Sequence, residues 1–339
     1  MKLSIAPLTL QTRHEFKIAR GGNQSWEHLV VELEHEGRVG RGEVAATAYY
    51  GETQATARAA LAAWEPFLPT DPWDAEGFER RARARLSWNR AAWNALDTAL
   101  WDLRGQIAGL PLWKLWGLDR AAMPLSSFTL GLASWEVMEL KLKEAERYPI
   151  LKIKVGGADD LHTLRQIRQR TDRPIRVDAN AGWTRDQAAR LLPALAELGV
   201  EFVEQPLAPS DREGLMWLAA RSPLPIYVDE ACHVASDVAG LSDRVSGVVV
   251  KLVKTGGPTE AFRLIHAARA HGLGLMLGCM IESSLGITAA AHLGPLFDTL
   301  DLDGHWLLAS DPFEGVGGGE GRLVLSDRPG LGVVPRQGG

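Results

Sequence analysis

Leu-Lys-Ile-Lys-Val at residues 151–155 opens a stretch, ending at Gly257, in which five short apolar runs each finish in charged residues. The later runs are Ile-Arg-Val-Asp (175–178), Phe-Val-Glu (202–204), Tyr-Val-Asp-Glu (227–230) and Val-Val-Val-Lys (248–251). Successive charges lie 22 to 26 residues apart, with helix-like segments such as 184–198 and 258–271 between the runs. A strand, a crossover helix and two loops need roughly 25–30 residues, so this spacing predicts a row of βα units.

Eight strand-like runs can be counted along the chain, which predicts an α/β fold with a (β/α)8-type barrel. They are residues 126–130, 151–155, 175–179, 202–205, 226–230, 248–252, 275–279 and 300–304. In such a barrel the carboxyl ends of all the strands meet at one rim, where the chemistry is collected. The charged residues that end these runs are therefore expected on one rim.

The first hundred residues follow a different pattern, which predicts a separate α+β unit. Residues 1 to about 50 alternate apolar and polar, as in an antiparallel meander, and helical periodicity follows over 53–67, 75–86 and 89–107. A barrel alone uses about 250 residues, so a chain of 339 leaves room for this unit. We expect a capping domain at 1–120, the barrel at 121–310, and a segment at 311–339 that packs back on the capping domain.

Composition is that of an ordinary soluble globular protein, with 46% hydrophobic and 23% charged residues. The net charge of −5 and the lack of a basic block argue against a nucleic-acid partner. No apolar run approaches the roughly 20 residues of a membrane span, and the apolar stretch 3–10 is too short and interrupted for a secretory signal. Two cysteines, Cys232 and Cys279, read as buried thiols in a reducing compartment. We expect a cytoplasmic protein.

Three acids on neighbouring strand ends, Asp178, Glu204 and Asp229, predict a magnesium site. Hard divalent cations take oxygen ligands, and the lack of nearby histidine or cysteine argues against zinc or copper. Any one of these acids could instead cap a helix at a βα loop. Three in succession, each after an apolar run, are much harder to explain by capping.

Lysines on opposite sides of this site predict acid–base chemistry. Lys152 and Lys154 lie two apart in an extended run and so share one face, toward the barrel interior. Burial or a nearby cation is expected to lower the pKa of Lys154 toward a range where the amine can accept a proton. Lys251 ends the sixth strand, four strands from Lys154 on the second, so two amines would face each other across the metal. That arrangement suits removal of a proton from a carbon and its return on either face.

The series Lys-Ile-Lys-Val, Val-Asp-Ala-Asn, Val-Glu-Gln-Pro, Val-Asp-Glu and Lys-Leu-Val-Lys-Thr-Gly-Gly resembles the enolase superfamily, in its muconate-lactonizing-enzyme subgroup. The resemblance covers nearly the whole chain and implies the modified (β/α)7β form of the barrel. It implies one Mg²⁺ per subunit, bound by Asp178, Glu204 and Asp229. It also implies that Lys154 and Lys251 are the two acid–base residues, that Lys152 neutralises the enolate or the substrate carboxylate, and that Asn180 and Glu230 support the metal site.

Asp301-Leu302-Asp303, in the eighth run, resembles the Asp-x-Asp motif of the dipeptide epimerases. Two carboxylates two apart on a strand point the same way and suit a primary ammonium, although a turn at Asp303-Gly304 with solvated acids is the plainer alternative. Arg20 could pair with a side-chain carboxylate of the second substrate residue, as in L-Ala-D/L-Glu epimerase. The other residues expected to bind substrate are Tyr50, Thr129, Met280 and Glu282.

Together these features predict a Mg²⁺-dependent dipeptide epimerase, an isomerase that works by 1,1-proton transfer, with a place in peptidoglycan peptide metabolism. The alternative is N-succinylamino acid racemisation with o-succinylbenzoate synthesis. Muconate cycloisomerisation is a weaker fit, because it has no ammonium group to bind. A barrel that binds metal without turnover is the non-enzymatic alternative. We expect a homo-oligomer, while the preferred dipeptide is not fixed by the sequence.

Overall fold

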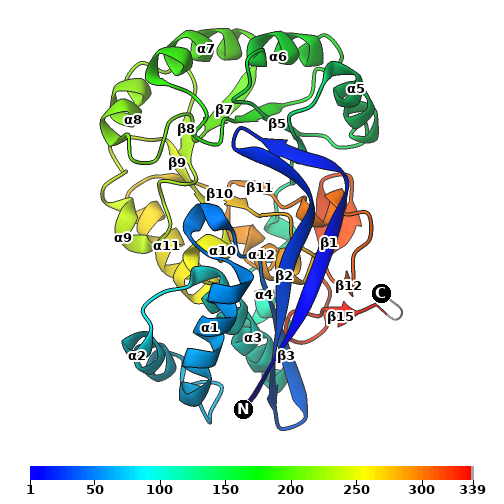
Figure 1. Ribbon diagram of the computed structural model, residues 1–339, viewed down its shortest axis with the longest axis vertical. Coiled ribbons are helices and arrows are strands. Elements are labelled where there is room, and N and C mark those ends of the chain that lie inside the picture. Colours follow the sequence, from blue (N-terminus) through cyan, green and yellow to red (C-terminus); the bar gives the residue numbers. More distant parts are fainter. Residues whose placement is uncertain (337–339) are drawn as a thin grey trace.

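The structure is a computed structural model that describes residues 1–336. An eight-stranded parallel sheet forms its centre, with the strands side by side in chain order from β4 to β11 (Figure 1). A parallel bridge between Ser126 and Leu300 joins the first strand to the last and closes the barrel. The strands are β4 (Phe128–Leu130), β5 (Leu151–Lys154), β6 (Ile175–Asp178), β7 (Val200–Glu204), β8 (Ile226–Val228), β9 (Gly247–Val250), β10 (Gly274–Gly278) and β11 (Thr299–Asp301).

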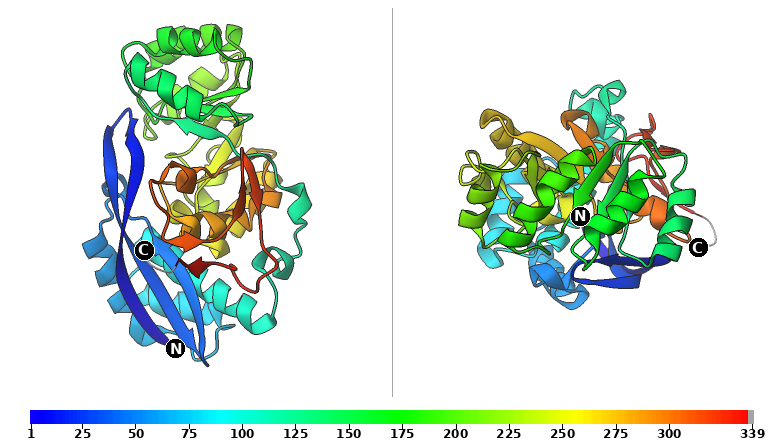
Figure 2. Two further views of the ribbon diagram at one scale, coloured as in Figure 1. Left: turned by 90° about the vertical axis from the view of Figure 1, so that its right-hand side faces the viewer. Right: turned by 90° about the horizontal axis from the view of Figure 1, so that it is seen from above.

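Helices connect the strands and cover the outside of the barrel (Figure 2). In α7, Thr184 and Gln187 form a capping box at the first turn, and Ala188, Leu192 and Leu195 make one buried face. None of the helices within residues 1–336 is both long and apolar enough to cross a membrane. The barrel helices are α5 (Trp135–Glu144), α6 (Asp160–Arg168), α7 (Arg185–Glu197), α8 (Arg212–Ala219), α9 (Ala235–Val238), α10 (Leu252–Thr255), α11 (Pro258–Ala270) and α12 (Ser284–Ala291).

The capping domain is an antiparallel sheet packed on helices, as the alternation of its sequence predicts. Its elements are β1 (Lys2–Ile18), β2 (Gly21–His35), β3 (Arg38–Val44), α1 (Gln54–Trp64), α2 (Ala75–Arg85), α3 (Arg90–Ala108) and α4 (Leu112–Leu115). Figure 1 shows the hairpin of β1 and β2 running from this domain along the barrel toward β5. The tip of the hairpin, at Ala19 and Arg20, therefore reaches the barrel rim.

The C-terminal segment contacts both larger parts of the molecule. Leu331 N donates to the Asp102 carboxylate of α3 (2.8 Å), while Val316 N donates to Thr288 Oγ1 of α12 (2.7 Å). Its short strands are β12 (Phe313–Glu314), β13 (Gly317–Gly319), β14 (Arg322–Val324) and β15 (Val334–Pro335). The contacts on α12 go beyond the expected packing on the capping domain, and the boundaries at 120 and 310 stay a prediction.

Three local features differ from the expectations. Strand β11 ends at Asp301, and Asp303 begins a 3-10 turn over Gly304–Leu307, so the two acids are not both on a strand. A short helix, α10, follows Lys251 directly. Both cysteines are free thiols, but only Cys232 is fully buried, because Cys279 lies at the rim just past the end of β10.

His292 links three parts of the fold and should make the protein sensitive to acid. Its Nδ1 accepts from Trp113 N (3.0 Å) and its Nε2 donates to Leu331 O (3.1 Å), which is the pattern of a neutral imidazole. The His292 ring has no exposed surface. Burial lowers the pKa of His292 to about 4, below the roughly 6.5 of an unfolded histidine. Because the folded pKa is the lower one, this stability, on the order of 3 kcal/mol, is present above pH 6.5 and lost as the pH falls toward 4.

We expect His292→Gln to have a lower free energy of unfolding than the wild type at pH 7. At pH 4.5 the difference in free energy of unfolding between the two proteins should be smaller. Urea denaturation of both proteins at the two pH values measures this, since the difference between them cancels the other titrating groups. A gap that stays constant with pH would contradict the assignment.

Candidate active site

The charged residues of the strand ends come together at one rim of the barrel, as predicted. In the sheet register Lys154 lies beside Asp178, and Asp178 beside Glu204. Asp229 follows β8 directly, and Lys251 follows β9. All five side chains are buried. The carboxyl ends of five successive strands therefore place three acids and two lysines in one interior.

Lys152 is the hub of this interior. Its Nζ lies 2.6 Å from Asp301 Oδ2, 2.7 Å from Glu204 Oε2 and 3.1 Å from Asp178 Oδ2, and 1% of the residue is exposed. Burial alone would lower the pKa of Lys152, but these three carboxylates outweigh it and hold the pKa well above the ordinary value. Lys152 is thus a fixed positive charge among the acids.

Lys154 ends strand β5 and Lys251 directly follows strand β9, four positions away in the closed sheet, so the two lysines lie on opposite sides of the barrel. Lys154 Nζ donates to Asp178 Oδ2 (2.6 Å), and Lys251 Nζ donates to Asp229 Oδ2 (2.8 Å). Each amine has its own carboxylate partner. The opposed arrangement expected from the strand count is present.

Burial and the nearby carboxylates act in opposite directions on the pKa of Lys251. Burial works to lower the pKa of Lys251, but Asp229 and Glu204 outweigh it, so the pKa is raised instead. Burial opposes ionisation of Asp229 as well, yet Lys251 and Lys254 hold the pKa of Asp229 well below its usual range. Lys251 is therefore held as an ammonium group beside Asp229 in this structure.

The three acids have the carboxylate oxygens that a hard cation takes as ligands, but their side chains do not converge on one point in this structure. Within residues 1–336, no three Asp, Glu, His or Cys side chains converge into a metal cluster, and lysine ammonium groups neutralise the carboxylates instead. Glu204 supports that fit most directly, because it is fully buried and its oxygens accept no hydrogen bond from the described residues, although the Lys152 ammonium lies 2.7 Å from Oε2. Burial, and then the charge of Asp178, raises the pKa of Glu204 to about 8.

Two residues that support this site were not assigned from the sequence. Lys254 ion-pairs with Asp229 Oδ1 and donates to the backbone carbonyls of Cys232 (3.1 Å) and Val249 (3.0 Å). The Gln205 side chain accepts from Asp229 N (3.0 Å). Both lie inside the quoted motifs, but their roles depend on contacts across strands that spacing does not reveal.

Asn180 lies where the sequence placed it, next to Asp178. Asn180 N donates to Asp178 Oδ1 (2.8 Å), and its side-chain nitrogen lies 3.3 Å from Oδ2. The backbone of Asn180 is left-handed, with φ of 45°, as is that of Gln205, with φ of 35°. Strained backbone of this kind persists where the surroundings impose it, often at functional sites. Here it aims the Asn180 side chain at the Asp178 carboxylate and the Gln205 side chain at the backbone of Asp229.

The acid pair lies beside the lysine hub, and Thr129 holds it. Asp301 Oδ1 accepts from Ser127 Oγ (2.7 Å) and Thr129 Oγ1 (3.2 Å), while Asp303 Oδ2 accepts from Thr129 N. Burial, and then the charge of Asp301, raises the pKa of Asp303 to about 7. The two acids are brought together, but by a turn and Thr129 rather than by one strand. Thr129 was expected to contact substrate, and in this structure its polar groups serve the acids.

The tip of the capping hairpin is fastened to the rim through Arg20. Arg20 Nη1 lies 2.8 Å from Glu230 Oε1 and donates to Asn180 O (2.6 Å), and its guanidinium lies 4.0 Å from the Tyr49 ring centroid. Tyr50 packs edge-on against His233 of the barrel. The predicted partner of Arg20 was a substrate carboxylate, whereas the structure pairs it with Glu230, whose side chain is 1% exposed.

Met280 and Glu282 lie in the loop that joins β10 to α12. Met280 packs against the core of the capping domain, and its backbone N donates to Glu282 Oε1 (2.9 Å). Burial, and then the charge of Glu43, raises the pKa of Glu282 to about 7. Both residues lie at the barrel rim beside the capping domain, which is where substrate-binding residues are expected.

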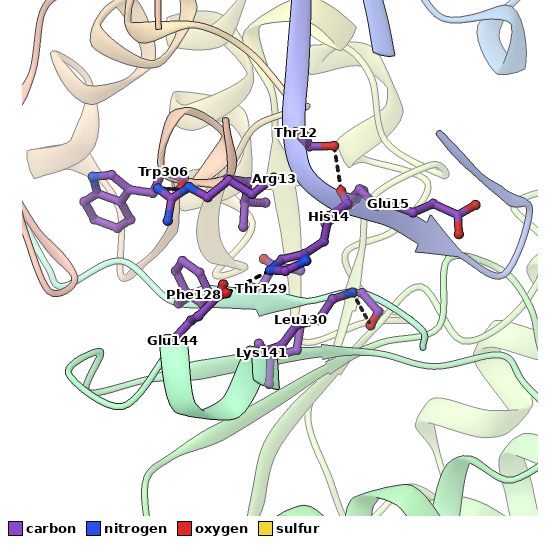
Figure 3. Close-up of a pocket in the computed structure, with 13 residues that line it drawn as sticks. Thr12, Arg13, His14, Glu15, Phe128, Thr129, Leu130, Lys141, Glu144 and Trp306 are labelled. Carbon is purple, nitrogen blue, oxygen red and sulfur yellow. Dashed lines mark hydrogen bonds and ion pairs between the residues drawn. The ribbon is translucent and has the colours of Figure 1, made fainter. Parts of the chain in front are cut away.

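A small cavity lies beside Thr129, the residue that holds the acid pair (Figure 3). It lies between β1, β4, α5 and the turn after Asp303, with His14, Thr129, Lys141 and Trp306 in its walls. Its volume is about 30 Å³, which is room for a water molecule and not for a dipeptide. The lysine and carboxylate cluster is separate from this cavity.

Comparison with known proteins agrees with this architecture. Residues 4–117 match the mandelate racemase / muconate lactonizing enzyme N-terminal domain, and residues 137–338 match the enolase C-terminal domain-like family. A hydrophobic dipeptide epimerase of a Flavobacteria bacterium is 39% identical, over 99% of each chain. The L-Ala-D/L-Glu epimerase of Bacteroides thetaiotaomicron is 36% identical, over 98% of this chain and 88% of its own length.

Among solved structures, the dipeptide epimerase of Enterococcus faecalis, complexed with Mg and the dipeptide L-Leu-L-Tyr, superposes with a TM-score of 0.93. It is 32% identical to this chain and the match covers 98% of both. Both domains and nearly the full length are thus accounted for by one family. The chain belongs to the enolase superfamily, in its mandelate racemase / muconate lactonizing enzyme group.

Proposed function

We propose that this protein is a Mg²⁺-dependent dipeptide epimerase, an isomerase that inverts the α-carbon of the C-terminal residue by two-base proton transfer. The observation that carries the proposal is the pair Lys154 and Lys251, buried on opposite sides of the barrel, each against its own carboxylate. The relatives named above act on dipeptides or bind one, which supports the substrate class.

Asp178, Glu204 and Asp229 would hold Mg²⁺ with their carboxylate oxygens. When bound, the ion supplies the positive charge that makes a proton next to a carboxylate acidic enough to remove. The test of this assignment is calorimetric titration of the protein with Mg²⁺. Glu204→Gln should weaken binding strongly, while Glu201→Gln, on the same strand but exposed and paired with Arg176, should leave it unchanged.

The two lysines divide the proton transfer by face. One amine, in its neutral form, takes the α-proton on its own side, and the other ammonium returns a proton from the opposite side. Lys152 keeps its charge throughout, because three carboxylates hold its pKa high. Its Nζ is therefore placed to neutralise negative charge that develops on the substrate carboxylate.

The acid pair selects for a free α-ammonium. Asp301 is already paired with Lys152 (2.6 Å), whereas among residues 1–336 Asp303 accepts hydrogen bonds from Thr129 alone. Asp303 is thus the acid whose negative charge is available to pair with the substrate's α-ammonium. Neither an N-succinylamino acid nor muconate carries such a group, so this pair favours dipeptides over both alternatives.

The function is tested by incubating the protein with Mg²⁺ in D₂O and following α-proton signals by NMR. L-Ala-L-Glu, L-Ala-L-Leu and other dipeptides should exchange and epimerise at the C-terminal residue. If only N-succinyl amino acids exchange, the racemase alternative holds. If metal binds but nothing exchanges, the barrel is a binding module.

Gly278 should be required for the position of Lys251. A Cβ at residue 278 would lie 3.0 Å from Lys251 Cε and 3.2 Å from Val249 Cγ1, which is too close without movement. Overpacking of this kind costs about 1–3 kcal/mol, and here it displaces a catalytic amine. We expect Gly278→Ala to lower kcat about tenfold or more, on the basis that a shift near 1 Å can cost about 10²-fold.

The matched control is Gly274→Ala, at the other end of the same strand, where a Cβ would meet the Tyr227 side chain. Both variants should lower the melting temperature, and only Gly278→Ala should lower kcat. Equal kcat values in the two variants would show that the lysine tolerates the methyl group.

A cytoplasmic location and assembly into a homo-oligomer complete the proposal, both from the sequence. Size-exclusion chromatography with light scattering tests the assembly directly. A single 36.9 kDa species at working concentration would contradict it.

A further inference from the structure

Glu43 of the capping domain is fully buried, yet it is bonded mainly to the barrel. Its Oε1 accepts from Ser283 N (3.1 Å), and its Oε2 accepts from Gly286 N (3.1 Å) and Ser283 Oγ. His28 Nδ1, from the neighbouring strand β2, lies 2.7 Å from Oε1. Both carboxylate oxygens are therefore engaged, and most of their partners come from the start of helix α12.

This contact caps a helix from another domain. Ser283 is the N-cap of α12, and Gly286 is its third residue, so Glu43 takes two of the amide groups that a helix N-terminus leaves unpaired. A carboxylate there is also favoured by the helix dipole. The next amide, Ser284 N, donates to Asp311 from the C-terminal segment (3.0 Å). The first turn of α12 thus donates hydrogen bonds to two carboxylates, Glu43 from the capping domain and Asp311 from the C-terminal segment.

Residues 279–282, which precede the N-cap Ser283, lie between Lys251 and the acid pair of Asp301 and Asp303. Met280 O would be 2.3 Å from a Cβ placed at Gly304, so the loop packs directly against the turn that carries Asp303. At its other end the loop follows Gly278 of β10, where an added Cβ would lie 3.0 Å from Lys251 Cε, so the start of the loop packs against that lysine. The β10–α12 loop, residues 279–283, therefore connects the strand end beside Lys251 with the acid pair.

We propose that Glu43 is a positioning residue that fixes the β10–α12 loop from the capping domain and so sets the distance between the acid pair and Lys251. Glu43 touches no reacting atom. It acts through Ser283 and Gly286 on a loop whose misplacement would spoil dipeptide binding. This inference rests on the proposed function, because the loop matters only if a dipeptide spans these two groups.

The test compares Glu43→Gln with Asp97→Asn. Asp97 is a matched control: it is a buried carboxylate of α3 in the capping domain that accepts from Thr259 N (2.8 Å) and Thr259 Oγ1 (2.7 Å) at the start of barrel helix α11. Each change replaces an acceptor oxygen by an amide group facing a donor. Both should lower the melting temperature. Only Glu43→Gln should raise KM for dipeptides, by about tenfold, with a smaller change in kcat.

Hydrogen exchange gives a readout that does not depend on activity. In Glu43→Gln the amides of residues 280–286 should lose protection, while in Asp97→Asn they should keep it. Glu43→Asp, which keeps the carboxylate but withdraws it by one methylene from Ser283 and Gly286, should show the same local change if Glu43→Gln does not fold. Unchanged KM together with unchanged protection in the Glu43 variant would overturn the inference. If the wild-type protein epimerises no dipeptide, the proposed function fails instead, and the exchange data still report on Glu43.

Discussion

Replacing Lys251 by alanine should abolish epimerisation while leaving exchange of the α-proton from one epimer. Removal of a general acid–base group typically costs about 10²–10⁴-fold, and in the proposed mechanism each face of the α-carbon is served by one lysine, because Lys152 stays charged. With Lys154 intact, a proton can still leave and return on one face. In D₂O, one epimer of the dipeptide should therefore lose its α-proton signal without inversion. Lys154→Ala should show the same behaviour with the other epimer.

Lys141→Met provides the control for loss of a buried lysine. Lys141 lies on α5 outside the barrel interior, is 7% exposed, and donates only to Gly131 O at 3.4 Å. Its removal should change stability without changing exchange on either face. If both epimers exchange equally in Lys251→Ala, a single base serves both faces and the two-base proposal is wrong.

Lys251→Ala should also weaken the fold, for a reason separate from catalysis. Removing one partner of a buried ion pair costs about 3–5 kcal/mol, because the other charge is left without compensation. Asp229 keeps Lys254 as a second partner, so the cost should fall at the low end of that range. A kcat measured well below the melting temperature separates the two effects.

The sequence predicted the strand ends well because the period of the pattern and the position of the charge depend only on local chain geometry. Asp178, Glu204, Asp229, Lys154 and Lys251 follow apolar runs, and parallel strands bring such ends to one rim. The roles of these residues as ligands and bases stay predictions, because the described structure contains their ion pairs and not the reaction.

What the sequence could not predict depends on contacts between distant segments. The pairing of Arg20 with Glu230 needs the hairpin tip to reach the rim, which no spacing encodes. Glu43 gave no motif signal, since its partners are about 240 residues away. The raised pKa of Lys251 follows from burial being outweighed by carboxylates that only the folded barrel brings near. Local periodicity thus fixes which residues face the barrel interior, and tertiary contacts fix their charge states.

Asp303→Asn should lower kcat/KM for dipeptides by about 30- to 4,000-fold and should leave substrates without an ammonium almost unaffected. Loss of one partner from a desolvated charge pair costs about 2–5 kcal/mol, with each 1.4 kcal/mol equal to tenfold. An N-acetylated dipeptide lacks the cation and is the matched poor substrate. The preference for the free dipeptide over its acetylated form should therefore collapse in the variant.

Acidity should act on the same residue. Burial and the charge of Asp301 raise the pKa of Asp303 to about 7, and only the ionised form attracts an ammonium. In the wild type, kcat/KM for a dipeptide should hence be retained above pH 7 and fall as the pH drops through that value. Asp303→Asn should remove this limb of the profile. Asp298→Asn, which alters an acid at the opposite end of β11 that accepts from Leu275 N (2.8 Å), should keep both the profile and the preference. If kcat/KM falls equally for the acetylated and the free dipeptide in Asp303→Asn, Asp303 has a structural role at the rim and does not bind the ammonium. The preference for dipeptides over N-succinyl substrates would then lose its structural basis.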